Sequence, residues 1–340
     1  MDEQRKREHL RICLEQDVRS TITTGLERYQ LVHRALPEIA LEQVDTRTRF
    51  LGRDLAAPLL VSAMTGGTPL AGEVNRRLAS AAQELGLAMV LGSQRAGIET
   101  PSLMGTYQVR DVAPDILLLA NLGAVQLNYG YGVEECRRAV DSVGADALVL
   151  HLNPLQEALQ SGGNTNFANL VTKIGWICDE LSVPVVVKEV GWGISPEIAV
   201  KLHRVGVSAL DVAGAGGTSW SEVESRRDTK SLQALAAEAF GGWGIPTAEA
   251  LVGVREVCPQ LPLIASGGVT NGVEVAICLA LGGDMVGMAH SLLAPAVDSL
   301  AAVVEKLRVV LMQLRVAMFC TGARTIADLD ANRLAVRMDV

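Results

Sequence analysis

The sequence predicts an α/β protein of the (β/α)8 TIM-barrel type with an N-terminal extension. From Pro58 onward, short β-branched or leucine-rich runs alternate with longer segments rich in Ala, Leu, Glu and Arg. These runs number eight, and each is apolar along its length, as expected of strands buried on both faces. Eight βα units favour a closed barrel over an open doubly wound sheet, which usually has five or six strands.

The composition suits one large buried core. Apolar residues make up 49% of the 340 residues, and 33 glycines allow many tight turns. Because aromatic residues make up only 4%, Val, Leu, Ile and Ala must fill the core. The formal charge of −8 argues against a general nucleic-acid-binding surface, which needs a basic field.

The cysteines and the N-terminus indicate the cellular compartment. The six cysteines are widely spaced without a C-x-x-C pair, which is typical of reduced core thiols. The N-terminus is charged, and no stretch of about 18 apolar residues occurs. We therefore expect a cytoplasmic protein with neither a signal peptide nor a membrane span.

Two segments are expected along the chain: an N-terminal extension over residues 1–57, packed beside the barrel, and the barrel itself over residues 58–340. The extension contains the cationic run Arg5-Lys6-Arg7, followed by His9. Such a run is either a solvated helix face or an anion clamp, and composition leaves both open.

The eight predicted strands are short and begin at intervals along the whole barrel segment. They cover residues 58–63, 88–92, 115–121, 146–152, 183–189, 207–212, 262–265 and 284–288.

Helices are predicted where apolar residues recur at spacings of three and four. They cover residues 70–85, 134–143, 167–181, 196–205 and 272–281. Ser195-Pro196 reads as an N-cap followed by proline in the first turn, and glycines such as Gly86 stand where helices should end. A final long helix, over about residues 292–319, is expected to close the ring. The stretch 218–246 is too long for an ordinary βα loop, so we expect it to cover the active site.

Polar or glycine-rich residues follow almost every predicted strand. The active site of a barrel is built from the C-terminal ends of its strands, so these residues carry functional weight together that none carries alone. They lie at residues 63–67, 92–95, 121–123, 151–157, 188–189, 213–218, 265–268 and 287–290.

The glycines after the seventh and eighth strands occupy the place where many barrels hold a phosphate. Exposed backbone N–H groups and a helix N-terminus supply positive potential there without a side chain. Thr218 could add a hydroxyl. The pattern predicts a mononucleotide cofactor or a phosphorylated substrate, and spacing does not separate the two.

Lys188 ends an apolar strand, where an ammonium group is costly unless it meets an anion or an electron-rich partner. Three interpretations are open. Lys188 is a structural lysine paired with a carboxylate, a Schiff-base nucleophile, or a cation beside a flavin ring that stabilises the reduced anionic form.

The segment after the fourth strand is unusually polar, with His151, Asn153, Gln156 and Glu157 within seven residues. Glu157 could coordinate Mg²⁺ together with phosphate oxygens, because Mg²⁺ typically takes one or two carboxylates. The alternative is a surface glutamate at the start of a helix. His151 is either a catalyst or a satisfied buried histidine.

Taken together, the motifs resemble the type 2, flavin-dependent isopentenyl-diphosphate isomerases, in family order and over nearly the whole chain. The resemblance rests on Arg5-Lys6-Arg7-Glu8-His9-Leu10, Met64-Thr65-Gly66-Gly67, Gly92-Ser93-Gln94-Arg95, His151-Leu152-Asn153-Pro154-Leu155-Gln156-Glu157, Val187-Lys188-Glu189-Val190-Gly191, residues 213–220, Trp243-Gly244-Ile245-Pro246-Thr247 and Ser266-Gly267-Gly268.

The resemblance implies a homo-oligomer, a tetramer or an octamer, that interconverts isopentenyl and dimethylallyl diphosphate with reduced FMN, Mg²⁺ and NADPH as the reductant. Gln156 would lie near the reacting carbons, Lys188 would tune the flavin ring, and Glu157 would bind the metal. FMN would contact Ala63, Met64, Thr65, Ser93, Asn121, Lys188, Thr218, Gly267, Gly268, Ala289 and His290. The diphosphate would contact Arg5, Lys6, Ser93, Gln94, Arg95, His151 and Asn153.

One segment and one residue depart from the family pattern. After Gln156-Glu157 many members carry an acidic Glu-Gly-Asp-like stretch, whereas this chain has Ser161-Gly162-Gly163-Asn164-Thr165-Asn166-Phe167, and His290 stands where arginine is frequent. The main alternative function is an FMN-dependent barrel oxidoreductase of the 2-hydroxy-acid oxidase type. A Schiff-base aldolase that uses Lys188 and a non-catalytic barrel are further alternatives.

Overall fold

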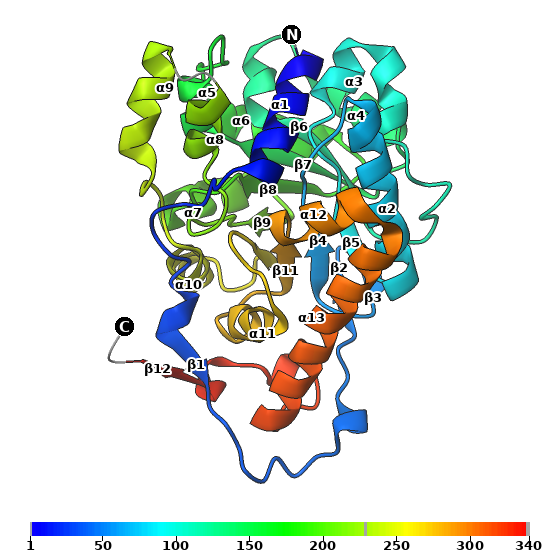
Figure 1. The fold of residues 1–340 in the computed structure, drawn as a ribbon, viewed down its shortest axis with the longest axis vertical. Helices are drawn as coiled ribbons and strands as arrows, with labels where there is room; N and C mark the ends of the chain where they lie inside the picture. Colours follow the sequence, from blue (N-terminus) through cyan, green and yellow to red (C-terminus); the bar gives the residue numbers. More distant parts are fainter. Residues whose placement is uncertain (1, 228–229, 338–340) are drawn as a thin grey trace.

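The centre of the molecule is a closed barrel of eight parallel strands (Figure 1). The structure is a computed structural model that describes residues 2–227 and 230–337. Each strand pairs with the next along the chain, and β11 pairs with β4 to close the ring, so the predicted (β/α)8 barrel is confirmed. The strands are β4 (Leu59–Val61), β5 (Ala88–Val90), β6 (Leu118–Gly123), β7 (Ala147–Leu152), β8 (Val185–Glu189), β9 (Ala209–Asp211), β10 (Leu263–Ala265) and β11 (Met285–Met288).

All eight predicted strands are present, and the third is displaced along the chain. It was expected to begin at Asp115 but begins at Leu118. Asp115 is instead held outside the sheet, where its N–H donates to Gln83 Oε1 at 3.0 Å. The ladder begins where the N–H of Leu118 donates to the carboxylate of Asp146 at 2.9 Å.

The helices surround the barrel as predicted, with ends set by the expected capping residues. They include α2 (Pro69–Leu85), α4 (Val133–Asp141), α6 (Leu170–Glu180), α7 (Pro196–Arg204) and α11 (Gly272–Ala280). Ser195 caps α7 by accepting the N–H of Ile198, and Gly86 ends α2 at a φ of 64°. An additional helix, α10 (Thr247–Val257), follows β9.

The prediction of one final helix over residues 292–319 is wrong. Two helices occupy this part of the chain: α12 (His290–Asp298) and α13 (Leu300–Thr321). They are separated at Ser299, whose extended backbone (φ −162°, ψ 162°) cannot continue a helix. The Ser299 hydroxyl accepts the N–H of Ala302 at 3.1 Å and so starts α13. Apolar residues recur on both sides of the break, which is why the periodicity suggested a single helix.

The N-terminal extension contacts both ends of the barrel. Its first helix, α1 (Asp2–Glu15), packs over the C-terminal rim against α8 (Trp220–Arg227) and α12 (Figure 1). At the opposite end, the hairpin of β2 (Thr48–Phe50) and β3 (Arg53–Leu55) contributes Phe50 and Leu55 to the core inside the barrel. Strand β1 (Tyr29–Leu31) pairs antiparallel with β12 (Leu334–Val336), near the chain's C-terminus.

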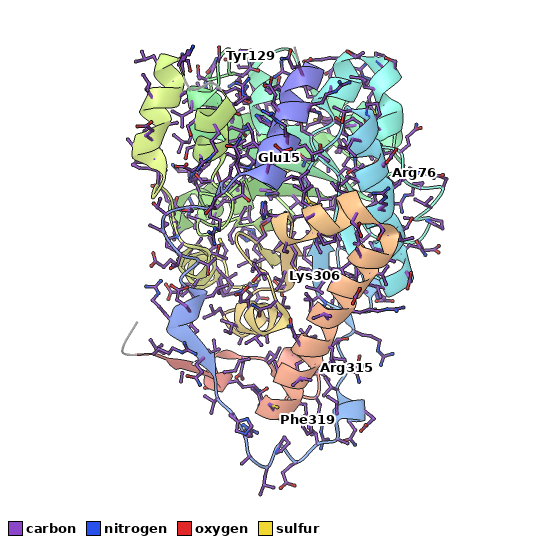
Figure 2. All side chains as sticks on the ribbon, viewed as in Figure 1. Glu15, Arg76, Tyr129, Lys306, Arg315 and Phe319 are labelled. Carbon is purple, nitrogen blue, oxygen red and sulfur yellow. The ribbon has the colours of Figure 1, made fainter. Side chains whose placement is uncertain are left out.

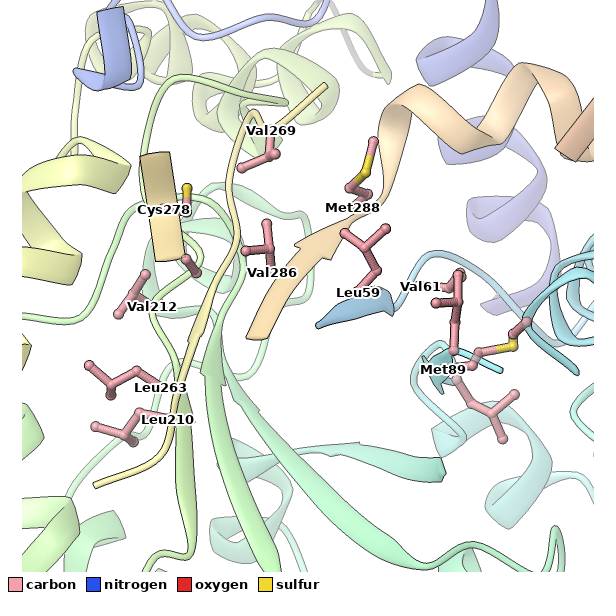
Figure 3. Packing of buried hydrophobic residues seen from close by; sticks show 14 of the residues in the cluster. Leu59, Val61, Met89, Leu210, Val212, Leu263, Val269, Cys278, Val286 and Met288 are labelled. Atoms are coloured by element: carbon pink, nitrogen blue, oxygen red, sulfur yellow. The ribbon is translucent and has the colours of Figure 1, made fainter. Parts of the chain in front are cut away.

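Buried apolar side chains form two large sets, one inside the barrel and one between the strands and the helices, and a small third set of Ile12, Val18 and Val223. Figure 3 shows part of the outer set, with Leu59, Leu210 and Leu263 among the packed side chains. Charged residues such as Arg76 lie on the outer helices (Figure 2). The six cysteines are free thiols. In the part of the chain that is described, no helix is both long and apolar enough to cross a membrane.

Candidate active site

The interior of the barrel changes from apolar to polar at the C-terminal ends of the strands. Inward-facing residues alternate along a strand, so Val186, Ala209 and Ile264 in the inner core place Lys188, Asp211 and Ser266 on the same inward side, one layer higher. On four further strands, the residues two positions after the inner-core residues are Ser62, Asn121, His151 and Gly287. The sequence thus builds a polar floor at the C-terminal end of the barrel.

A cavity of about 380 Å³ lies on this floor, beneath α1 and the segment that follows β9. All of the predicted site residues except Gln94 line it. They are Arg5, Lys6, Ala63, Met64, Thr65, Ser93, Arg95, Asn121, His151, Asn153, Gln156, Glu157, Lys188, Thr218, Gly267, Gly268, Ala289 and His290. Strand ends and the N-terminal arm therefore converge on one site.

Gln94 lies behind the cavity wall. Its side chain is fully buried, donates to the backbone carbonyl of Ala139 at 2.8 Å and accepts the N–H of Asn121 at 2.9 Å. Both ends of the amide are therefore committed to joining the ends of neighbouring βα units. The structure therefore does not bring the side chain of Gln94 to the cavity, and its contact with the substrate stays a prediction.

Lys188 is 7% exposed and faces the cavity, and its ammonium donates to the carbonyl of Glu189 at 2.6 Å. Among the described residues it forms no ion pair, which argues against a salt-bridged structural lysine. The Glu189 carboxylate lies in a turn where it accepts three backbone N–H groups, those of residues 190–192. Burial raises the pKa of Glu189 to about 7, although these donors and Lys188 act in the opposite direction.

Asp211, the register partner of Lys188 on β9, is 1% exposed. One of its oxygens accepts from the Ser266 hydroxyl at 2.6 Å, and burial raises its pKa against the effect of Lys188. The Lys188 ammonium thus lies in a buried layer that contains carboxyl groups but is directly bonded to none of them.

His151 is neutral and has a defined tautomer in the hydrogen-bond network. Asn121 donates its amide N–H to the carbonyl of Leu91 at 2.9 Å, so its Oδ1 accepts from Nδ1 of His151 at 2.9 Å. Burial and the charge of Lys188 lower the pKa of His151 to about 4. Nε2 therefore carries a lone pair at neutral pH.

The polar segment after β7 forms the short helix α5 (Pro154–Leu159). The Asn153 amide donates to Gln156 Oε1 at 3.1 Å and to Glu157 Oε1 at 3.2 Å. Glu157 is only 7% exposed and accepts the N–H of Asn164 at 2.6 Å, so the alternative of a surface glutamate is wrong. The side-chain oxygen Oδ1 of Asn153 is buried and has no hydrogen-bond partner among the described residues.

Cationic side chains reach the cavity from two directions. Arg95, the first residue of α3 (Arg95–Glu99), donates to Glu99 at 2.7 Å and to Asn164 Oδ1 at 2.9 Å. Lys6 of α1 donates to the Ser93 carbonyl at 3.2 Å and to the Tyr107 hydroxyl at 2.6 Å. Because Arg5 and Lys6 both line the cavity, the alternative of a solvated helix face is wrong for these two residues.

The sequence analysis missed a buried carboxylate, Glu224 of α8, which is 2% exposed. It accepts from His9 at 2.9 Å and from Arg227 at 2.8 Å, and Gln156 donates to it at 3.5 Å. Burial would raise the pKa of Glu224, but these partners hold it below its usual value. Trp220 meets the His9 ring edge-on at 5.2 Å. The helical spacing of Trp220, Glu224 and Arg227 is a signal that could have identified this face.

The glycines on the other side of the rim let three backbone segments approach closely. A Cβ on Gly267 would lie 2.2 Å from the carbonyl oxygen of Gly214, and one on Gly217 would lie 2.5 Å from the N of Gly268. Gly267 also has a φ of 106°, which other residues rarely adopt. His290, at the start of α12, turns its Nε2 to the carbonyl of Cys13 at 3.0 Å. The side chain of His290 thus contacts the N-terminal helix.

The comparisons with known proteins agree with this geometry. A sequence profile of the FMN-dependent dehydrogenase family matches residues 15–100 and 153–336. The chain is 54% identical to an isopentenyl-diphosphate delta-isomerase from Synechococcus sp. over 94% of its own length and 92% of that protein. It is 50% identical to the enzyme of that name from Rickettsia felis, over 97% and 95% of the two chains.

Solved structures of lower identity share the fold. A variant of mandelate oxidase superposes with a TM-score of 0.68 at 18% identity, over 99% of each chain. A variant of flavocytochrome b2 has a TM-score of 0.70 at 18% identity, over 96% of this chain and 82% of the other. The profile match and the identity to full-length relatives show that the chain belongs to the isopentenyl-diphosphate delta-isomerases of the FMN-dependent dehydrogenase family.

Proposed function

We propose that this chain interconverts isopentenyl and dimethylallyl diphosphate by an allylic double-bond shift that uses reduced FMN and Mg²⁺. The observation that carries the proposal is a single cavity lined by Lys188, the Gln156-Glu157 pair, and cations from both the barrel and the N-terminal arm. A diphosphate substrate needs several positive groups to offset its desolvation, whereas a 2-hydroxy acid substrate does not.

FMN fits the half of the rim built by β9, β10 and β11. The glycines there pack backbone against backbone with no room for a Cβ, and glycine-rich turns of this kind would offer N–H groups to the phosphate of FMN. The polar floor adds the Ser62 hydroxyl, which is buried and has no hydrogen-bond partner among the described residues. Bound there and reduced by NADPH, FMN would supply the group that exchanges protons with the substrate carbons.

Mg²⁺ fits beside α5. Glu157 provides a carboxylate, and the unpartnered Oδ1 of Asn153 provides a second hard oxygen next to it. Within the described residues, no three His, Cys, Asp or Glu side chains gather as a ready-made metal site. This agrees with an ion that takes one carboxylate from the protein and its other ligands from diphosphate and water.

The chain's own residues then have distinct roles. Arg5, Lys6 and Arg95 bind the diphosphate, and neutral His151 faces the same cavity with its Nε2 lone pair. Gln156 orients the alkene, and Glu224 fixes the Gln156 amide. Lys188 stabilises negative charge on the reduced cofactor electrostatically. The reaction adds one proton at one carbon of the allylic unit and removes one at another, without net redox change.

The N-terminal arm closes the site in this proposal. Its helix α1 is held to α8 by the His9–Glu224 contact and to α12 by the bond from His290 to Cys13. Such closure excludes water from the reacting carbons. Assembly as a tetramer or octamer and a cytoplasmic location remain part of the proposal.

The test is a visible spectrum of the purified protein with FMN, followed by an anaerobic isomerisation assay with NADPH and Mg²⁺. We expect a yellow protein that isomerises isopentenyl diphosphate only when FMN is reduced and Mg²⁺ is present. A yellow protein without isomerisation, active instead on 2-hydroxy acids, would favour the oxidoreductase. Full turnover by a Gln156→Ala variant would remove Gln156 from the mechanism.

A further inference from the structure

Asn164 connects the two parts of the candidate site that would bind anion and metal. Its side-chain oxygen accepts from Arg95 Nη1 at 2.9 Å and from the buried amide of Gln126 at 3.3 Å. Its backbone N–H donates to Glu157 Oε2 at 2.6 Å. One residue therefore bonds directly to both a guanidinium and a carboxylate that line the cavity.

The loop that presents Asn164 is built to hold it in place. Gly162 has a φ of 69°, and the N–H of Gly163 donates to the carbonyl of Gln160 at 3.0 Å. A Cβ on Gly163 would lie 1.9 Å from the carbonyl oxygen of Glu157, so only glycine allows the loop to pack directly on the backbone of α5. The position of Asn164 relative to Glu157 is thus fixed by the backbone.

The contacts of Asn164 also determine which charges face the cavity on either side of it. Arg95 also donates to the Glu99 carboxylate at 2.7 Å, and neutral Asn164 orients the guanidinium without adding a second negative charge beside it. The N–H bond holds one oxygen of Glu157 and leaves the carboxylate its negative charge for a cation. An anion on Arg95 and a cation on Glu157 would therefore lie on either side of the same residue.

We propose that Asn164 is a positioning residue that couples binding of the substrate diphosphate to binding of the divalent metal. The inference rests on the proposed function and adds to it a residue that touches neither reacting atoms nor cofactor. Coupling of this kind means that each ligand tightens the other by the same factor.

The test measures binding of inorganic pyrophosphate to the FMN-loaded protein by calorimetry, without Mg²⁺ and with saturating Mg²⁺. The ratio of the two Kd values is the coupling factor, and complex formation between the ions in solution cancels when variants are compared. Asn164→Ala should lower the factor by about fivefold or more, because Arg95 loses its fixed orientation beside Glu157. Asn164→Asp should raise it, because the added charge repels free pyrophosphate and attracts Mg²⁺.

Asn166→Ala is the matched control, since Asn166 is exposed, lies in the same loop and contacts neither Arg95 nor Glu157. It should keep the wild-type factor within about twofold. An Asn164→Ala protein with the wild-type factor would overturn the inference, as would an Asn164→Asp protein with a lowered one. A wild-type protein that does not bind pyrophosphate would overturn the proposed function itself, and the coupling with it.

Discussion

The two halves of the barrel rim differ in the groups that they offer to a negatively charged ligand. Around β9, β10 and β11 the rim is made of glycines whose backbones nearly touch, and we propose that their N–H groups bind the cofactor phosphate. Around β5 to β8 it is made of side chains, among them Arg95, His151 and Lys188. In the backbone half the proposed ligands are N–H groups that do not titrate, whereas the side-chain half depends on the charges of its side chains. Substitutions in each half separate these properties.

Gly267→Ala should have the largest effect. Its Cβ would lie 2.2 Å from the oxygen of Gly214 and at a φ of 106°, so the cradle must distort. We expect FMN affinity to fall by at least about 100-fold, measured by quenching of flavin fluorescence. Gly105→Ala is the control, because no atom lies within 4 Å of its added Cβ. Undiminished FMN affinity in the Gly267 variant would contradict a role for the backbone cradle.

Lys188→Met tests the side-chain half. Loss of a buried cation at the cavity floor should lower kcat for isomerisation by about 100-fold in an anaerobic assay. The fold should persist, because Lys188 has no ion-pair partner among the described residues. Lys173 lies on the outer helix α6, where it donates to the carbonyl of Leu127. The variant Lys173→Met should leave kcat unchanged. Equal losses in the two variants would argue against a specific electrostatic role.

His151→Asn isolates the pH dependence of the side-chain half. The wild-type histidine has a pKa lowered from 6.5 to about 4, so the unfolded chain binds more protons between these values. The free energy of unfolding of the wild type, taken relative to that of the variant, should therefore rise with pH across this window. Near pH 4 this difference should be roughly 3 kcal/mol less favourable to the wild type than it is above pH 7. Urea unfolding of both proteins from pH 4 to 7.5 measures the difference, which should be constant above about pH 7. A difference that does not change with pH would contradict the lowered pKa.

His290→Ala should have the smallest effect. The exposed imidazole contacts the carbonyl of Cys13, while the rim beneath it is formed by backbone. Loss of this bond should cost about 0.5 kcal/mol of stability and change FMN affinity by less than about threefold. Thermal unfolding and the flavin titration measure both. A loss of FMN as large as that of Gly267→Ala would show that this half also depends on a side chain.

The elements whose hydrophobic pattern is set by burial were predicted from the sequence. The strands are apolar on both faces, so β7 and β8 were predicted nearly to the residue, and their polar ends followed. Features that depend on tertiary contacts were not predicted. The direction of Gln94 depends on neighbouring strand ends, and the break at Ser299 lies within a continuous apolar repeat. Glu224 becomes a site residue only when α1 folds back over the rim.

Pairing between β1 and β12 joins segments that lie about 300 residues apart. The N–H of Val32 donates to the carbonyl of Arg333, and that of Arg337 to the carbonyl of Arg28, so the start of the chain is anchored by its end. During translation β12, the partner strand of β1, leaves the ribosome after all eight strands of the barrel. A growing chain therefore forms the barrel strands before β1 has its partner strand, and the contacts that hold α1 over the rim, such as His9 with Glu224, do not depend on that pairing.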